Sequence, residues 1–513
     1  MSAGGFTILD LLIVVAYLVG TTLLGVWLGR DQKDAKDYFV AGKAIPWWAI
    51  LFSVVATETS ALTFISIPGV AYLGNFTFLQ VAAGYLIGRV IVAFTLLPRY
   101  YQGELVTAYS LLERRFGVAT RRFASIIFMV TRTFGDSVRL FATSIPLALL
   151  LGGFIAADFV GPVSILILGV FTVIYTYHGG MRAVVWTDVL QTGVYLFGGL
   201  GAVYLLGQGV DGGWGAIFER AGAAGKLQVI DPFFGLENRP NTLWAGLIGG
   251  AFLSMASHGA DQIIVQRLLA SQNLRDARRA LIGSGIMVLA QFALFLLIGI
   301  GLWAYYDAQT FAVADSIFPR FIIEGMPAGM TGLVIAALLA AAMSTVSGAL
   351  NALSAASTQD IYLPLKGRPQ DDPSALKVGR TFTLIWAVIL VGGALMYRET
   401  GTPVVIIALS IASFTYGGLL GAFFMALTLG RARQRDALIG MAVGISLMTL
   451  VVFSNPLKGT FPALEPLSRI AWPWYVLIGT TITYVTGAIS SFIGGTGRGH
   501  QGRTTDAPPR PAT

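Results

Sequence analysis

The sequence predicts an all-α polytopic membrane protein with about thirteen transmembrane helices. Of its 513 residues, 55% are hydrophobic and only 12% are charged, whereas soluble domains carry roughly 25% charged residues. The mean hydropathy is +0.73, and apolar runs of the ~20 residues that a membrane helix needs recur throughout the chain. This composition excludes a soluble enzyme and a disordered hub. The absence of Cys also excludes disulfides and thiolate metal sites.

The basic residues test the number of spans. When successive loops are assigned to alternate sides, 24 of the 34 Lys and Arg residues fall on one side and 7 on the other, with 3 inside spans. The positive-inside rule then places the N-terminus outside and the C-terminus in the cytoplasm. We expect one transmembrane domain over 1–493 and a disordered cytoplasmic tail over 494–513. The apolar spans lie near 7–28, 47–70, 77–98, 122–151, 156–176, 183–207, 242–266, 280–304, 328–357, 378–396, 403–429, 437–454 and 472–493.

Two spans are interrupted by polar residues where hydrocarbon would surround them. The second span carries Thr57, Glu58, Thr59, Ser60 and Thr63, and the seventh is interrupted over 254–262 by Ser, His, Gly, Asp and Gln. Intramembrane polar groups are costly, so they indicate functional positions. An unwound stretch that lines a cavity tolerates them, and paired broken helices mark a transporter's binding site. The alternative is a continuous helix packed through small residues.

A polar face on the ninth span indicates a cation site. Ser344, Ser347 and Asn351 are spaced i, i+3 and i+7, so they share one helix face. Asp188, near the start of the sixth span, lies at about the same depth as Ser344. A carboxylate beside hydroxyl groups suits a monovalent cation, although small-residue packing explains the ninth span equally well. Asp188 also suits a helix N-terminus.

Arginines inside the spans have two interpretations. Arg132, Asp136 and Arg139 on the fourth span are spaced so that an internal Arg–Asp pair can form. Alternatively, one arginine is free to hold a solute carboxylate through two hydrogen bonds. Arg89 on the third span is expected to extend towards the membrane edge or to pair locally.

Three motifs resemble those of the sodium:solute symporter family. They are Gly-Gly-Met-Arg-Ala-Val-Val-Trp-Thr-Asp at 179–188, the stretch 341–351 followed by Asp-Ile-Tyr at 360–362, and Asp261-Gln262 leading into Gln266-Arg267. The resemblance covers roughly 5–490. It implies a LeuT-type fold of two inverted five-helix repeats, here about 47–207 and 242–429.

The resemblance also implies site residues. A core sodium site would use the carbonyl groups of Ala56, Thr59 and Ala341 with the hydroxyl groups of Ser344 and Thr345. A second sodium would use Asp188 and Ser347, although Gly348 stands where some members have another serine. The solute candidates are Ser60, Thr63, Gln80, Ser254, Arg132 and Arg139.

The resulting hypothesis is a secondary active transporter, not an enzyme, in the cell membrane. It couples inward sodium movement to uptake of a small organic anion of the monocarboxylate, vitamin or sialic acid kind. Its partners are sodium, the solute and lipid, with no nucleic acid and no obligatory protein. No P-loop for ATP hydrolysis is present. The alternatives are a proton-coupled carrier in which Glu58 or Asp188 titrates, a channel, and a sensor.

Overall fold

The computed structural model describes residues 7–493 except 31, 104, 152–154, 238, 312 and 398–403. In this part of the chain the regular structure is helical, and β-structure is limited to two isolated bridges, Ile45 with Ser271 and Glu237 with Ile470. The tail predicted for 494–513 lies outside the described residues.

The helices follow the predicted spans closely. The α-helices are α1 (Ile8–Leu28), α2 (Ala35–Val40), α3 (Trp47–Glu58), α4 (Ala61–Leu73), α5 (Leu79–Phe94), α6 (Leu97–Tyr100), α7 (Ser110–Phe116), α8 (Val118–Leu151), α9 (Ala157–Gly209), α10 (Gly213–Ala223), α11 (Gly250–Gly259), α12 (Gln262–Leu269), α13 (Leu274–Tyr305), α14 (Ile317–Glu324), α15 (Met330–Ala355), α16 (Leu363–Leu365), α17 (Ala375–Met396), α18 (Val404–Thr428), α19 (Gln434–Val452), α20 (Ser454–Leu457), α21 (Glu465–Ser468) and α22 (Trp474–Ile493). Short 3-10 or π-helical turns adjoin some of them: η1 (Ala41–Lys43), η2 (Ala245–Gly249), η3 (Ala314–Ser316), η4 (Ala356–Tyr362) and η5 (Pro462–Leu464).

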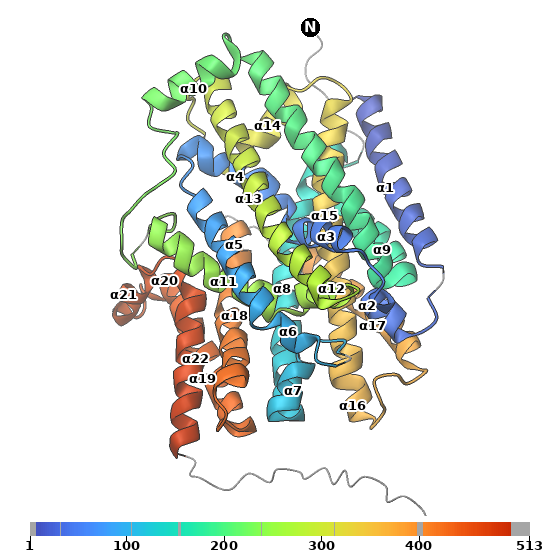
Figure 1. Cartoon of the computed structure of the whole chain (residues 1–513). Helices are drawn as coiled ribbons and strands as arrows, with labels where there is room; N and C mark the ends of the chain where they lie inside the picture. Colours follow the sequence, from blue (N-terminus) through green and yellow to red (C-terminus); the bar gives the residue numbers. More distant parts are fainter. Residues whose placement is uncertain are drawn as a thin grey trace, which may run out of the picture.

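The long helices form one bundle (Figure 1). Among the described residues, seven helices are long and apolar enough to cross a membrane, and the bent pair α3 and α4 makes an eighth. One of the seven, α9, contains two of the predicted spans, 156–176 and 183–207. The start of α1 and the end of α22 lie at opposite ends of the bundle (Figure 1). The prediction of an all-α, multi-pass membrane protein is confirmed.

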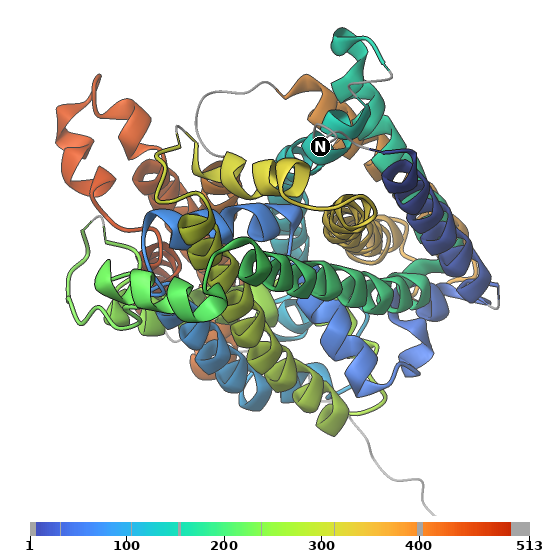
Figure 2. The same ribbon diagram turned by 90° about the horizontal axis from the view of Figure 1, so that it is seen from above.

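The centre of the bundle is α15, which is seen end-on in Figure 2. From Thr331 to Ala355 almost every residue of α15 is buried, against α9, α8, α17 and α1. Its many Ala, Gly and Ser residues let neighbouring backbones approach closely, as is usual where membrane helices pack. At its start, the backbone amides of Gly329 and Gly332 donate to Asp10 of α1 (2.8 and 2.7 Å).

A single glycine allows α9 to turn. Gly180 has φ 48° and ψ −147°, the one non-helical residue inside α9. Only glycine adopts this conformation readily, because it lacks a Cβ. A Cβ at this position would also collide with the backbone carbonyl of Tyr38 in α2. The kink therefore sets the direction of the second half of α9, which carries Asp188.

We expect Gly180→Ala to lower the free energy of unfolding by about 1–3 kcal/mol from backbone strain alone, with the collision against Tyr38 adding to it. Thermal unfolding of the purified protein in detergent measures the loss. Gly193→Ala is the matched control, because Gly193 lies on the same helix and a Cβ there would meet nothing within 4 Å. Equal melting temperatures for the two variants would contradict this account of the kink.

Candidate ion and solute site

The first broken helix supplies backbone oxygens at the middle of the bundle. Between α3 and α4 the axis bends by 64°, and Thr59 and Ser60 are extended (ψ 91° and 163°). The amide of Ser60 donates to the carbonyl of Glu58 (3.1 Å), whereas in an unbroken helix it would donate to that of Ala56. The break predicted at 57–63 is confirmed. It leaves the Ala56 carbonyl without its ordinary helical donor, as a cation site requires.

Hydrogen bonds to α13 hold the side chain of Thr59 in place at the break. Its hydroxyl group exchanges hydrogen bonds with the amide of Gln291 on α13 (2.9 and 2.6 Å), and the hydroxyl of Tyr195 on α9 donates to the same Gln291 oxygen (2.8 Å). Thr59 and Gln291 are almost fully buried. These bonds fix the orientation of the Thr59 peptide, so the side chain positions the residue and leaves the backbone carbonyl as the candidate ligand.

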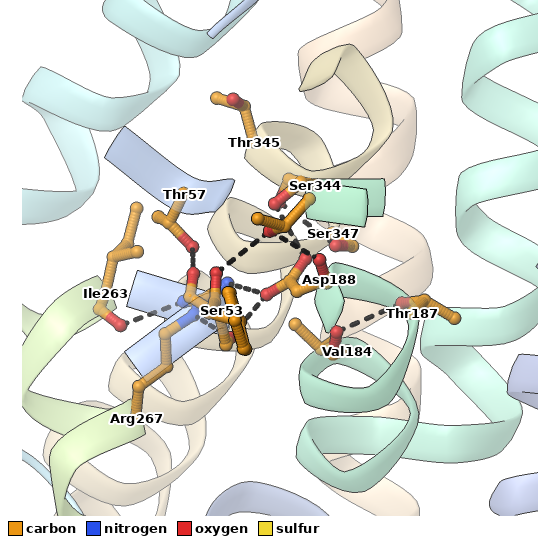
Figure 3. A network of polar contacts seen from close by, with 12 residues as sticks. Ser53, Thr57, Val184, Thr187, Asp188, Ile263, Arg267, Ser344, Thr345 and Ser347 are labelled. Carbon is orange, nitrogen blue, oxygen red and sulfur yellow. Dashed lines mark hydrogen bonds and ion pairs between the residues drawn. The ribbon is translucent and has the colours of Figure 1, made fainter. Parts of the chain in front are cut away.

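The polar face predicted on the ninth span lies on α15. Ser344 and Ser347 are fully buried, and Thr345 is 4% exposed. The hydroxyl of Thr345 donates to the carbonyl of Ala341 (3.1 Å), and that of Ser347 donates to the carbonyl of Ser344 (3.1 Å). In Figure 3, Thr345 lies apart from the contacts made by Ser344. Donating a proton leaves each hydroxyl oxygen with lone pairs that a sodium ion can use.

Asp188 joins the broken helix to α15. Its carboxylate accepts hydrogen bonds from Ser344 (2.6 Å) and from Ser53 of α3 (2.5 Å), and these contacts converge in Figure 3. The equal depth predicted for Asp188 and Ser344 is confirmed by this direct bond. The carboxylate also forms an ion pair with Arg267 of α12 (3.2 Å), a contact that the sequence analysis missed.

The second break lies between α11 and α12, as predicted for the seventh span. Asp261 is extended there and accepts a hydrogen bond from the amide of Ile263 (2.9 Å), so it caps α12. Its other oxygen pairs with Arg132 of α8 (2.5 Å). Arg132 also donates to the hydroxyl of Tyr416 on α18 (2.7 Å). The second break is therefore tied to two other helices.

The two arginines predicted inside the fourth span, Arg132 and Arg139 of α8, differ in their freedom. Arg132 is bound to Asp261 and lies 3.6 Å from Asp136. Arg139 pairs with Asp136 through one nitrogen (3.1 Å), and its side chain is 21% exposed. The internal pair predicted from the spacing therefore forms, and it involves both arginines. Arg139 keeps more of its donors available.

The other solute candidates also differ in their surroundings. Ser60 and Thr63 are half-buried at the first break, where the Ser60 hydroxyl caps α4. The hydroxyl of Ser254 donates to the carbonyl of Tyr85 (2.8 Å). Gln80 is 4% exposed. Its amide donates to the carbonyl of Asn241 (2.9 Å) and accepts from the amide of Asp231 (3.2 Å), so it anchors the segment before α11.

Glu58, Arg89 and His258 form a second charged cluster beside the break, called here the Glu58 cluster. Arg89 is fully buried, pairs with Glu58 and donates to Ser284 of α13 (3.1 Å). His258 lies with Nε2 3.7 Å from the Glu58 carboxylate. Of the two expectations for Arg89, extension towards the membrane edge is wrong, because Arg89 is fully buried on a helix that packs against α11 and α13. Arg89 does pair, with Glu58 of α3.

Comparison with known proteins identifies the family. A model described as the sodium:solute symporter family matches residues 38–444. The chain belongs to this family. The sodium/sialic acid symporter NanT of Aliivibrio fischeri is 31% identical over 96% of this chain and 94% of its own. The sodium-dependent multivitamin transporter of Oryctolagus cuniculus is 27% identical over 99% of this chain and 85% of its own.

Solved structures agree with this assignment. This symporter resembles a Na⁺-coupled sialic acid symporter in a substrate-bound outward-open state, with a TM-score of 0.82 and 28% identity over 95% of this chain and 98% of the other. A nucleobase-cation-symport-1 family transporter shares the fold, with a TM-score of 0.56, 14% identity, and coverage of 91% of this chain and 95% of the other. The predicted family, sodium-coupled symport and sodium as the transported ion are confirmed.

Three residues of the symporter's polar centre were not identified from the sequence as site residues. Gln291 and Tyr195 hold Thr59, and Arg267 pairs with Asp188. Gln291 was detectable in principle, as an amide in the middle of an otherwise apolar span. The role of Arg267 was not, because it lies near a predicted span end, where an arginine ordinarily faces water.

Proposed function

We propose that this symporter carries a small organic anion inward, driven by sodium bound at a core site of five residues. The ligands are the carbonyl groups of Ala56, Thr59 and Ala341 and the hydroxyl groups of Ser344 and Thr345. The observation that carries the proposal is the break at Thr59 and Ser60, which frees backbone oxygens of a helix that also packs against α15. Uncharged oxygen ligands suit sodium and do not titrate, which favours sodium over a proton.

The proposed cycle follows from this placement. Sodium bound between the bent helix and α15 holds the two elements together and organises the solute pocket at the break. Solute binding then favours closure, and movement of the broken helices opens the inner side. Reciprocity requires that sodium and the solute raise each other's affinity by the same factor. Each charge moved through 100 mV contributes about 2.3 kcal/mol.

The solute pocket is proposed to include Ser60 and Thr63, with Arg139 as the cationic group. Ser60 and Thr63 are half-buried beside the break, and Arg139 has more donors to spare than Arg132. Gln80 and Ser254 remain in the proposed pocket, with their present hydrogen bonds as the contacts a solute would compete with, whereas Arg132, the remaining candidate from the sequence, is proposed to support the second break through Asp261. A relative is named for sialic acid, which is a carboxylic acid, and this supports an anion.

The domain organisation and the orientation in the membrane are also part of the proposal. Residues 1–493 form one transmembrane domain of thirteen spans, with inverted repeats at about 47–207 and 242–429. The protein lies in the cell membrane with its N-terminus outside and its C-terminus, including 494–513, in the cytoplasm. An odd number of spans agrees with the opposite positions of the start of α1 and the end of α22 (Figure 1).

The test is uptake into proteoliposomes with and without an inward sodium gradient. The panel holds monocarboxylates, sialic acid, pantothenate, proline and hexoses. We expect sodium-stimulated accumulation of one anion. Accumulation driven equally by a proton gradient in the absence of sodium would refute the proposal, and equilibration without accumulation would indicate a channel.

Replacing the two hydroxyl ligands is expected to abolish the sodium effect. Ser344→Ala combined with Thr345→Ala removes two of five ligands and should reduce sodium-stimulated uptake at least about 10-fold. Ser354→Ala is the matched control, because Ser354 lies on the same helix and donates to the carbonyl of Gly379 (2.6 Å), away from the core site. Equal loss in both variants would point to damage of α15 and not to a sodium site.

A further inference from the structure

Asp188 already has a cation as its partner. Arg267 is fully buried and lies with Nη2 3.2 Å from the Asp188 carboxylate. Its Nε donates to the hydroxyl of Ser53 (2.9 Å), which in turn donates to the same carboxylate oxygen. Its Nη1 donates to the carbonyl of Ile263 (3.0 Å). The guanidinium group is thus fixed on both sides, as Figure 3 shows.

Gly348 leaves room for the guanidinium group of Arg267, because glycine has no side chain. A Cβ added at Gly348 would lie 2.6 Å from Nη2 of Arg267 and 3.1 Å from Nη1. These distances are shorter than van der Waals contact, so a side chain at this position would require the end of Arg267 to shift. A glycine on α15 and an arginine on α12 therefore fit one another. Gly348 stands where the resemblance placed a serine in members with a second sodium, and in this chain the guanidinium group occupies the space that such a side chain would need.

The remaining groups around Asp188 do not favour a second ion. The carboxylate carries one negative charge, and a guanidinium group stays positive at any pH a protein tolerates. A sodium ion bound to the same carboxylate would face the guanidinium charge at short range, inside a bundle where screening is weak. The Ser347 hydroxyl donates to the Ser344 carbonyl (3.1 Å) and keeps lone pairs for a cation, so the opposing group is the guanidinium of Arg267 and not Ser347. Asp188 paired with Arg267 does not fit a second sodium.

We propose that Arg267 is a built-in cation that takes the place of a second sodium ion at Asp188, so that this symporter binds one sodium ion per chain. This inference rests on the proposed core sodium site and replaces the sequence-based expectation of a second site at Asp188 and Ser347. It also gives Asp188 a different task. Through Ser53, Ser344 and Arg267, the carboxylate joins both broken helices to α15 without itself binding an ion.

Direct counting of bound sodium tests the inference without knowledge of the solute. The purified full chain in detergent is titrated with ²²Na⁺ in a scintillation proximity assay. We expect one ion per chain and a Hill coefficient of 1, with binding lost in Thr345→Ala. Two ions per chain would overturn this inference and leave the core site standing. No bound ion would overturn the core site and the proposed function with it.

Variants test the role of Arg267 itself. Arg267→Gln leaves Asp188 without its resident cation, so we expect a second ion per chain. Adding Asp188→Asn to it removes the charge that attracts that ion and should restore one. Gly348→Ser, which displaces the guanidinium group, should also bind a second ion. If Arg267→Gln elutes as a monodisperse peak in size-exclusion chromatography and still binds one ion, the inference is overturned.

Discussion

Replacing Glu58 with alanine should lower the free energy of unfolding by about 3–5 kcal/mol. The reason lies with Arg89, whose side chain is fully buried and whose carboxylate partner is Glu58. Its other described hydrogen bond is to the neutral hydroxyl of Ser284 on α13 (3.1 Å). Without Glu58 the guanidinium group would be an uncompensated buried charge between α5, α11 and α13, and such charges are costly.

The melting temperature in detergent measures this loss, and a double variant separates charge from packing. Glu58→Ala with Arg89→Met leaves no buried charge and should recover most of the stability lost in Glu58→Ala. If the double variant is no more stable than the single one, the ion pair is not the cause. A Glu58→Ala protein of unchanged stability that loses proton-driven uptake would instead support the proton-coupled alternative.

The sequence predicted features that depend on position along one helix. The breaks near Thr59 and Gly259 follow from polar residues and glycine in otherwise apolar spans, and both occur in the structure. The depths of Asp188 and Ser344 follow from counting residues from a span edge, and the two groups are bonded. Counting along a helix works because the rise per residue is fixed.

Pairing between helices could not be predicted in the same way. Arg89 and Glu58 lie 31 residues apart, and Arg267 and Asp188 lie 79 apart. Which charged groups meet depends on how each helix is rotated and on how closely its neighbours approach. That approach is set by small residues such as Gly348, whose importance appears only once Arg267 is seen against it. The spacing of residues along one sequence does not show which helices approach one another or which charged groups meet.

Arg132 also makes a contact between helices that the sequence could not predict, and this contact changes the role expected for the residue. Its spacing from Asp136 predicted a local pair, and that contact exists at 3.6 Å. Its shorter contact is with Asp261, 129 residues away (2.5 Å), which caps α12 at the second break. Arg132 is therefore better placed to hold the broken helix than to meet a solute, whereas Arg139 is free enough to do so.

We accordingly expect Arg132→Ala to destabilise the protein by about 3–5 kcal/mol, because Asp261 would be left buried without its cation. Arg139→Ala should cost less than Arg132→Ala, since its side chain is 21% exposed and Arg132 remains beside Asp136. Thermal unfolding of both variants measures the difference in stability.

Transport by the same two variants then separates support of the helix from contact with the solute. Arg139→Ala should lower the melting temperature less than Arg132→Ala and raise the KM for the transported anion, while Arg139→Lys, which keeps the charge, should recover part of the affinity. Arg132→Ala should lose uptake in step with the loss of folded protein. If Arg132→Ala were stable and raised the KM, whereas Arg139→Ala left it unchanged, the roles would be reversed. The contact with Asp261 would then be one that an anionic solute replaces when it binds.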